Sequence, residues 1–325
     1  MNSLSLLCMT DVSPANLGLA SMFKAAGDPM RLDILRIMRR DSFGVLELCN
    51  VFSVQQPSMS HHLKVLAKAG LVATRREGNS IFYRRASSVD GDIRLFLESF
   101  FRLIDLAPAS NEVVSEVEKI QVARRAQATE FFRANAHRFR EQQDLIAGHK
   151  DYGALVANML TKDQQFNWLE IGPGDGELLQ DCVAGFKEVT VLDVSEEMLE
   201  QSRNTLSKDM QGRVDFVHAD TRTAVEKGVR ANVISCNMVL HHVPSPADMI
   251  QDMASMLKDG GQLLITDLDQ HDQDWARSAC GDLWLGFSPE QLNEWSEGAG
   301  MVPGRSDFLA LRNGFGVQIR EYLKR

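Results

Sequence analysis

Two kinds of hydrophobic pattern divide the chain. Between Leu17 and Arg40, apolar residues recur every three or four positions, which predicts two helices separated at "AGDP". In that break Gly27 can end one helix, Asp28 can cap the next, and Pro29 suits its first turn. The first segment of the chain is therefore predicted to be helical.

Two short helices and a hairpin come next. The pattern predicts helices over Val45–Phe52 and from Pro57 to Ala69, with a turn at 53–56. "LVATRREGNSIFYRRA" has two β-prone runs on either side of Gly78 and Asn79, which indicates a hairpin. Helix, turn, helix and basic hairpin is the order of a winged helix-turn-helix. A last helix, over 93–106, carries so much apolar surface that we expect it to pack against a second subunit.

The pattern changes after "APAS" at 107–110. A charged helical connector with room for one break is predicted over 112–146. From Asn167 onward, short β-branched runs such as "FNWLEI", "VTVLDV" and "GQLLITDL" alternate with helices, which predicts a mostly parallel sheet covered by helices. The last two runs are joined through Asn313 and Gly314, as in a closing hairpin. The predicted domains are residues 1–107, 108–146 and 147–325.

Composition is that of an ordinary globular protein, with 44% hydrophobic and 24% charged residues. No apolar run approaches the ~18 residues of a membrane span, and no secretory signal is apparent, so we expect a cytoplasmic protein without a membrane partner. The net charge of −9 is uneven. Residues 1–107 carry 13 Lys and Arg against 10 Asp and Glu, while the remainder carries 22 against 34. A basic patch on an acidic chain suggests a confined contact with a polyanion.

The cysteine pattern excludes two kinds of site. Cys8, Cys49, Cys182, Cys236 and Cys280 are scattered, odd in number and never spaced as C-x-x-C. This argues against a disulfide framework and against a zinc site of clustered thiols. We expect buried reduced thiols and no metal site.

The stretch "QQPSMSHHLKVLAKAGLVATRREGNSIFYRR" has the features of a DNA reader. A recognition helix needs short polar side chains at its N-terminal end, where base edges are reachable, and the arms of a wing contact the backbone or minor groove. The residues that we assign to double-stranded DNA are Ser58, Ser60, His61, His62, Lys64, Arg75, Arg76, Arg84 and Arg85.

This stretch, together with "FKAAGDPMRLDIL", resembles the ArsR-type family of bacterial repressors over roughly residues 17–106. The resemblance implies a homodimer that binds an imperfect palindrome and leaves it when an effector binds. Many members sense metals through a Cys pair in an "ELCVC"-like sequence. Here that sequence is "ELCNVF", with Cys49 present and Val51 at the second position. One soft ligand makes a poor thiophilic site, so metal sensing is not expected there.

A glycine loop, "WLEIGPGDGE", opens the second half. It reads G-x-G-x-G, one residue short of the dinucleotide fingerprint, and Asp175 and Glu177 would repel a pyrophosphate. A nucleoside without phosphates is the better ligand. Asp193 ends the second strand, where an acidic residue takes both ribose hydroxyls. Asp220 ends the third strand, where it can accept from an adenine amino group, and Met198 could cover the ring.

With "VLDVSEEML", "VHAD" and "SCNMVLHHV", this loop looks like the class I S-adenosylmethionine-dependent methyltransferases over roughly residues 130–325. The resemblance implies a Rossmann-like α/β fold with a mostly parallel, seven-stranded sheet and S-adenosyl-L-methionine as cofactor. It places Glu170 toward the methionyl amine. The full cofactor set is Glu170, Gly172, Gly174, Gly176, Asp193, Val194, Met198, Asp220, Thr221 and Asn237.

The acceptor side of this fold should lie after the fourth and fifth strands. His241 and His242 lie there, with Asp267, Asp269, His271, Trp275 and Trp284 in the later segment, and this lining suits a small organic acceptor. His242, His271 and Asp267 are the catalytic candidates. His241 and His242 could instead cap or pack a loop, and the tryptophans could be core residues of a lid. The whole chain thus predicts a repressor fused to a small-molecule methyltransferase. Two alternatives stay open: a sensor that binds the cofactor without turnover, and an enzyme whose first domain only dimerises.

Overall fold

The computed structural model describes residues 14–39, 41–77, 80–86, 91–135 and 139–325. Cys8 and the predicted turn residues Gly78 and Asn79 lie outside these ranges. The chain divides into two compact units between Val117 and Glu118, inside the long helix α6 (Asn111–Asn135). This division falls within the stretch that the sequence predicts as the connector.

The first unit is a winged helix-turn-helix, as predicted. Asp28 caps α2 by accepting a hydrogen bond from the Arg31 amide at 3.1 Å, and Pro29 takes the first helical position. The three-stranded sheet has the order β1-β3-β2, and the short strand at Phe43 was not predicted from the sequence. The elements are α1 (Pro14–Ala26), α2 (Pro29–Ile37), β1 (Phe43–Gly44), α3 (Val45–Phe52), α4 (Gln56–Lys68), β2 (Val72–Glu77), β3 (Ser80–Arg85) and α5 (Gly91–Ile104).

The second unit alternates strands and helices. After the later part of α6 come α7 (Phe139–Ile146), α8 (His149–Met159), β4 (Asn167–Ile171), α9 (Glu177–Cys182), η2 (Val183–Gly185), β5 (Glu188–Asp193), α10 (Glu196–Thr205), α11 (Lys208–Gln211), β6 (Val214–His218), α12 (Thr221–Glu226), β7 (Ala231–Asn237), η3 (Leu240–His242), α13 (Pro246–Met256), β8 (Leu257–Leu268), α14 (Trp275–Cys280), α15 (Pro289–Gly298), β9 (Met301–Ala310) and β10 (Gly316–Lys324).

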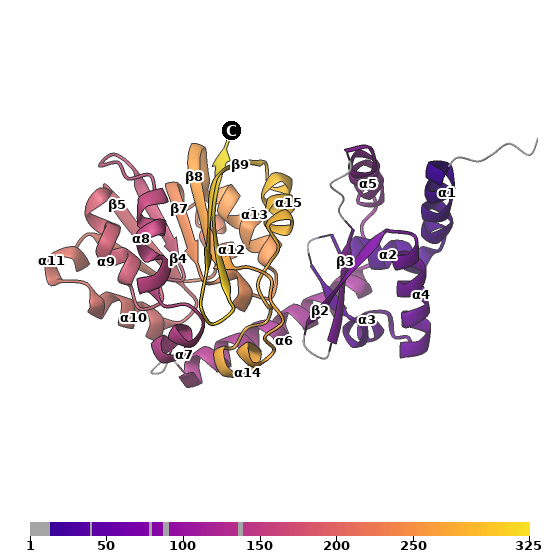
Figure 1. The fold of residues 1–325 in the computed structure, drawn as a ribbon, viewed down its shortest axis with the longest axis horizontal. Helices are drawn as coiled ribbons and strands as arrows, with labels where there is room; N and C mark the ends of the chain where they lie inside the picture. The colour runs from indigo at the N-terminus through magenta and orange to yellow at the C-terminus, as the bar shows by residue number, and fades with distance from the viewer. Residues whose placement is uncertain (1–13, 40, 78–79, 87–90, 136–138) are drawn as a thin grey trace, which may run out of the picture. The chain divides into compact units, whose positions relative to one another are not determined.

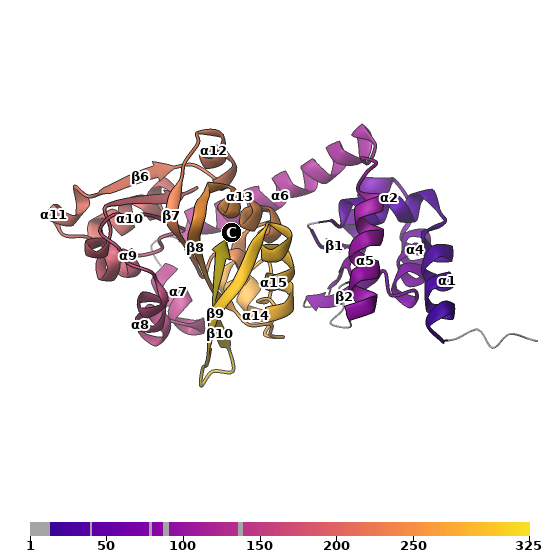
Figure 2. The same ribbon diagram turned by 90° about the horizontal axis from the view of Figure 1, so that it is seen from above.

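These strands form one seven-stranded sheet of order β6-β5-β4-β7-β8-β10-β9. Strands β4 to β8 are parallel, and β10 runs antiparallel between β8 and β9, which confirms the predicted fold and its closing hairpin. Helices α8, α9 and α10 form one neighbouring group, and α12, α13 and α15 form another (Figure 1, Figure 2). Because the chain runs outward from β4 to β6 and returns at β7, the carboxyl ends of β4 and β7 flank a topological switch point, where such sheets bind ligands.

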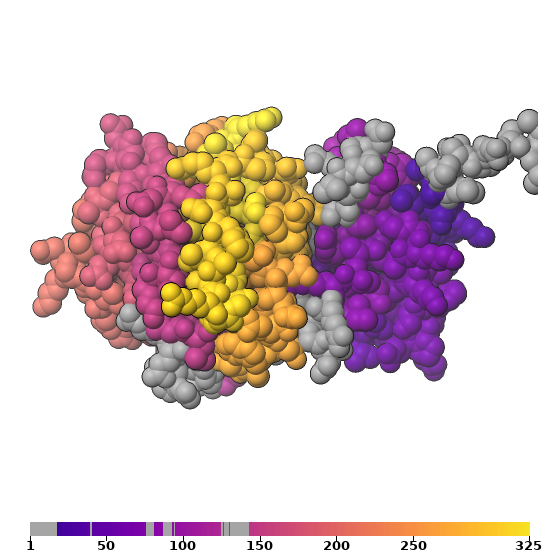
Figure 3. Space-filling model, viewed as in Figure 1, coloured from indigo at the N-terminus to yellow at the C-terminus, as the bar shows by residue number. Residues whose placement is uncertain are grey.

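The core of this unit lies between the sheet and its helices. Trp168, Phe186 and Ile319 are among its fully buried side chains, and the rings of Trp168 and Phe186 lie 5.0 Å apart. Strand β9 is one edge of the sheet and is mostly exposed, and Figure 3 shows the β9–β10 region, in yellow, on the surface of this unit. Among the described residues, no helix is both long and apolar enough to span a bilayer.

Candidate cofactor and nucleic-acid sites

The glycine loop after β4 makes a tight turn at the switch point. Gly172, Gly174 and Gly176 have φ values of 66°, 54° and 80°, a region that other residues rarely adopt. A side chain at Gly172 would run into Val239, and one at Gly176 would press on the backbone of Ser202. The glycines are therefore needed both for the turn and for the close packing of the loop.

Glu170 lies on β4 just before this loop and is buried. The Ser235 hydroxyl and the Asn237 side-chain amide donate to its two carboxylate oxygens, the latter at 3.0 Å. The Trp168 indole in turn donates to Ser235 Oγ at 2.6 Å. Burial raises the pKa of Glu170 to about 7, although both hydrogen bonds oppose this rise. A buried carboxylate with a raised pKa is a favourable partner for a cationic group.

Asp193 ends β5, the strand next to β4. Its Oδ1 accepts a hydrogen bond from the Ser195 amide at 2.8 Å. Burial raises the pKa of Asp193 to about 6, against the hydrogen bonds from the Ser195 and Val194 amides. Since β4 and β5 are parallel neighbours, Asp193 and the glycine loop both lie at the carboxyl ends of the strands.

The remaining predicted cofactor residues differ in their hydrogen-bond partners and in their exposure. Asp220 caps α12 by accepting from the Thr223 amide at 2.8 Å, and the Thr221 hydroxyl donates to Asp252 at 2.7 Å. The Thr221 hydroxyl proton is thus already used within the fold. Met198 is buried on α10, and Val194 is 53% exposed.

The chemistry of these groups fits a nucleoside that carries an amino acid. The side-chain oxygen Oδ1 of Asn237 is buried and has no hydrogen-bond partner in the described part of the chain. It belongs to the same side chain that donates to Glu170, so a carboxylate and an unused acceptor lie together. An ammonium group would satisfy both. Glu170 and Asn237 could hold the amine, and Asp193 the ribose.

The acceptor side centres on a buried His–Asp pair that the sequence did not single out. His241 Nδ1 donates to Asp267 Oδ1 at 2.8 Å, and both side chains are fully buried. Asp267 also accepts from the Leu240 amide at 2.9 Å and the Leu268 amide at 2.8 Å. Burial tends to lower the pKa of His241, but the Asp267 and Asp282 carboxylates outweigh it, so this pKa is raised. Asp267, predicted as catalytic, therefore orients His241.

The other two catalytic candidates lie in different surroundings. His242 is buried, and its Nδ1 lies 3.3 Å from the Gly281 carbonyl oxygen. Burial and the neighbouring His241 hold the pKa of His242 well below its usual range. His271 is partly exposed, accepts from the Gln273 amide at 3.3 Å, and packs edge-on against Phe315. A neutral His242 keeps a ring-nitrogen lone pair, which is suited to binding a cation.

The recognition helix α4 presents the predicted polar residues. Ser58, Ser60, His61 and Lys64 are exposed, whereas Met59, Leu63 and Leu66 on the same helix are buried. His62 is less exposed, with Nδ1 3.8 Å from Asp28 at the start of α2. Arg75 and Arg84 are partly exposed on the wing strands, and the structure does not describe the side chain of Arg76.

Arg85 differs from the other arginines that the sequence assigns to DNA. The sequence predicts that it contacts DNA, but its side chain is buried. Its guanidinium donates to both carboxylate oxygens of Asp105, one at 2.9 Å, and to the Leu35 carbonyl at 2.7 Å. It also lies over the Phe101 ring at 4.8 Å. Arg85 therefore ties β3 to α2 and the end of α5.

The winged helix-turn-helix of the first unit is typical of a DNA-binding domain. The Rossmann-like sheet of the second unit, with a glycine loop and buried carboxylates at the carboxyl ends of β4 and β5, is typical of a methyltransferase domain. The methyltransferase domain family matches residues 103–300, more than half of the chain, and the bacterial regulatory protein arsR family matches residues 28–74. The chain belongs to the methyltransferase domain family and carries an ArsR-family helix-turn-helix.

Individual relatives match one domain each. An uncharacterized HTH-type transcriptional regulator of Methanocaldococcus jannaschii is 45% identical over 65 residues, 20% of this chain and 73% of that protein. The ubiquinone biosynthesis O-methyltransferase of Coxiella burnetii is 24% identical over 146 residues, 41% of this chain and 62% of the enzyme. The chain thus spans less than two thirds of that enzyme. The structure of N-methyltransferase NodS from Bradyrhizobium japonicum in complex with S-adenosyl-L-homocysteine has 16% identity and a TM-score of 0.41, covering 54% of this chain and 85% of its own.

Proposed function

We propose that this protein is a transcriptional repressor whose second domain binds S-adenosyl-L-methionine and methylates a small molecule. The observation that carries the proposal is the convergence of Glu170, Asn237 and Asp193 beside the glycine loop, where an amine and a ribose would each find a matching partner. The buried His241–Asp267 pair at the carboxyl end of β7 supports a small acceptor bound next to that edge.

The direct test is to incubate the purified protein with methyl-labelled S-adenosylmethionine and an extract of cell metabolites. A labelled product that fails to form with the Asp193→Ala variant supports methyl transfer. The name of the Coxiella relative directs the first search to hydroxyl-bearing acceptors. If no extract yields a labelled product while the protein still binds S-adenosylhomocysteine, the catalytic part of the proposal fails and the sensor alternative remains.

A sensor role is the second candidate, and the contacts of α6 favour it. Helix α6 begins in the first unit, and its later residues contact the acceptor-side loops: Gln121 donates to Ser245 Oγ at 3.3 Å and Arg124 donates to the Pro244 carbonyl at 3.4 Å. Arg124 also lies 5.2 Å from the Trp284 ring. A ligand that moves these loops would disturb their contacts with α6, and this helix continues into the DNA-binding unit.

Operator titrations with and without saturating S-adenosylmethionine, S-adenosylhomocysteine or acceptor test this coupling. Coupling free energies of ~1–3 kcal/mol would shift operator affinity roughly 5- to 150-fold, and operator DNA must shift ligand affinity by the same factor. If neither direction moves by more than about twofold, the sensor role fails.

The first domain is proposed to bind an imperfect palindrome as a homodimer. Helix α5 and its neighbours expose Ile93, Leu95, Leu103 and Leu106, and Phe23 of α1 packs edge-on against Phe96. An apolar surface of this kind on a terminal helix suits a second copy of the chain.

Replacing residues on α4 should separate affinity from base preference. Lys64→Ala should weaken binding to all DNA sequences and reduce the slope of affinity against salt by about one, because it removes one phosphate contact. Ser60→Ala and His61→Ala should instead change the preferred bases. Binding-site selection followed by salt titration measures both effects. Retention of affinity and preference in the Ser60 and His61 variants would refute the assignment of α4.

Cofactor affinity should rise with pH between about pH 5 and about pH 8. In the free protein Asp193 holds a proton below about pH 6 and Glu170 below about pH 7, because their pKa values are raised to these levels. A ribose and an ammonium group bind the ionised forms. Below its pKa each group should cost up to tenfold in affinity per pH unit. Calorimetric titration with S-adenosylhomocysteine should show both steps, and Glu170→Gln should remove the upper one. A flat profile in the unaltered protein would contradict this placement of the cofactor.

A further inference from the structure

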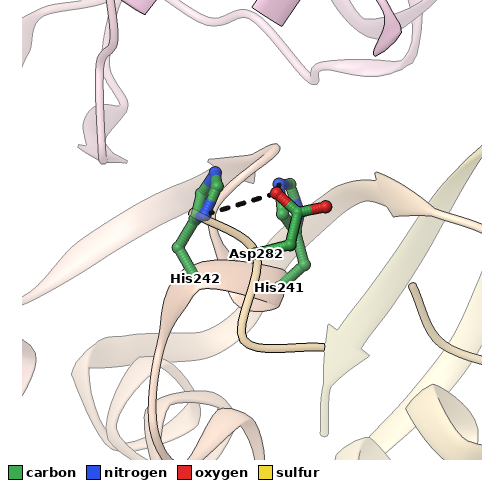
Figure 4. Close-up of side chains that lie close together, drawn as sticks. All are labelled: His241, His242 and Asp282. Carbon is green, nitrogen blue, oxygen red and sulfur yellow. Dashed lines mark ion pairs between the residues drawn. The ribbon is translucent and has the colours of Figure 1, made fainter. Parts of the chain in front are cut away.

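The acceptor side contains a group of side chains that the proposed methyl transfer does not by itself require. His241, His242 and Asp282 are buried, and one ligand atom from each lies within 4.8 Å of the others (Figure 4). The two histidines lie on η3 after β7, and Asp282 follows α14. The group therefore joins two segments that are far apart in the sequence.

Its internal distances are too long for hydrogen bonds. Asp282 Oδ1 lies 3.9 Å from His241 Nε2 and 3.8 Å from His242 Nδ1. Ligands bound about 2.0–2.2 Å from one ion lie roughly 3–4 Å from each other, so these separations suit atoms that share a cation. Two imidazoles and a carboxylate are a ligand set of zinc and similar divalent transition metals.

The orientation of His241 supports a metal ligand. Its Nδ1 donates to Asp267, so the lone pair of the neutral ring is on Nε2, the atom that faces Asp282. Nε2 is buried and has no hydrogen-bond partner in the described part of the chain. A carboxylate that fixes the far nitrogen of a ligating histidine is a recurrent feature of metal sites. Asp267 is itself fixed by the Leu240 and Leu268 amides.

His242 can complete the set without rearrangement of its loop. Its Nδ1 is the atom nearest Asp282, and a proton on this nitrogen would be donated to the Gly281 carbonyl only over a long distance of 3.3 Å. To bind a cation through Nδ1, the neutral ring would carry its proton on Nε2 instead.

We propose that His241, His242 and Asp282 bind one divalent transition-metal ion of the zinc class, which fixes the segment 281–285 over the carboxyl end of β7. The backbone already joins the same segments, because the Leu283 and Trp284 amides donate to the His241 carbonyl at 2.9 and 3.1 Å. The Trp284 indole donates to the Val243 carbonyl at 2.8 Å. The ion would hold segment 281–285 in place next to the acceptor side. The proposal revises the expectation of no metal site, and it goes beyond the proposed function because metal binding needs no methyl transfer.

The experiment measures metal directly in full-length protein prepared without a histidine tag. The protein is stripped with EDTA, dialysed against Zn²⁺ and analysed by mass spectrometry for bound zinc. We expect one Zn²⁺ per chain, and loss of that ion in His242→Ala and Asp282→Asn. His149→Ala is the matched control, since His149 forms a partly exposed pair with Asp181 at 3.1 Å but belongs to no group of three possible metal ligands among the described residues. It should keep the ion.

Co²⁺ gives a second reading that does not depend on the variants. Loaded into the unaltered protein, it should produce the visible absorption of a low-symmetry, four-coordinate site, and Zn²⁺ should abolish that absorption. The proposal is overturned if the unaltered protein binds no zinc, if the variants retain it, or if the control loses it equally. S-adenosylhomocysteine titration of the stripped protein keeps the two hypotheses apart, because retained cofactor binding with no metal uptake would refute only the metal site.

Discussion

Asp193→Ala should lower the affinity for S-adenosylhomocysteine by about 10²- to 10⁴-fold. Two ribose hydroxyls would lose a charged acceptor, and hydrogen bonds to charged groups are worth ~1.5–3 kcal/mol each, with ~1.4 kcal/mol for each factor of ten. The fold should survive, because burial already disfavours the ionised form of Asp193, whose pKa is raised to about 6. The effect should therefore appear in binding and not in stability.

Calorimetric titration at about pH 8, where the carboxylate is ionised, measures this affinity. Glu188→Ala is the matched control: Glu188 starts the same strand, is exposed and pairs with the neighbouring, also exposed Lys187 at 3.8 Å. It should bind as the unaltered protein does. Equal affinities for the Asp193 and Glu188 variants would place the ribose elsewhere.

The fold and the cofactor edge could be predicted from local sequence for a physical reason. Short β-branched runs specify buried parallel strands, and parallel strands bring their carboxyl ends to one edge. Glu170, Asp193 and Gly172 each lie at or next to the end of such a run, so their approximate places follow from the strand pattern. The short strand β1 has no such signal, because its two residues pair only once β3 is in place.

Side-chain partners across the fold could not be predicted in this way. Asp267 is the penultimate residue of β8, and its contact with His241 depends on the turn after β7, where Met238 adopts a φ of 55°. Asp282 reaches the histidines only through the chain reversal that follows α14. The sequence therefore pointed to the acceptor side but selected His242 and Asp267 as independent candidates. It did not pair His241 with Asp267, and it did not place Asp282 beside the histidines.

Arg85 illustrates the same limit in the first unit. Arg84 and Arg85 are adjacent on β3, and successive side chains of a strand point to opposite faces, so at most one of them can readily face DNA. Sequence composition counts both as part of a basic patch. Burial distinguishes them: Arg84 is partly exposed and Arg85 is buried against Asp105.

Arg85→Met should destabilise the DNA-binding unit by ~2–3 kcal/mol, without a direct effect on phosphate contacts. Removing one partner of a buried ion pair typically costs ~3–5 kcal/mol. The expected loss is smaller because the Asp105 side chain keeps 18% exposure and a second neighbour, Arg39, at 3.4 Å. Methionine retains the apolar stem of the side chain, so the change isolates the guanidinium.

Urea denaturation can assign this loss to one unit, because all four tryptophans (Trp168, Trp275, Trp284 and Trp295) lie in the second unit. Far-ultraviolet circular dichroism should show an earlier transition for Arg85→Met, while the tryptophan fluorescence transition stays in place. Arg39→Met is the matched control, since Arg39 pairs with the same Asp105 but is 58% exposed, and its loss should cost less than ~1 kcal/mol. If Arg85→Met instead left stability unchanged and reduced the salt dependence of DNA binding, Arg85 would be a phosphate contact, and its buried pairing with Asp105 would not describe the protein in solution.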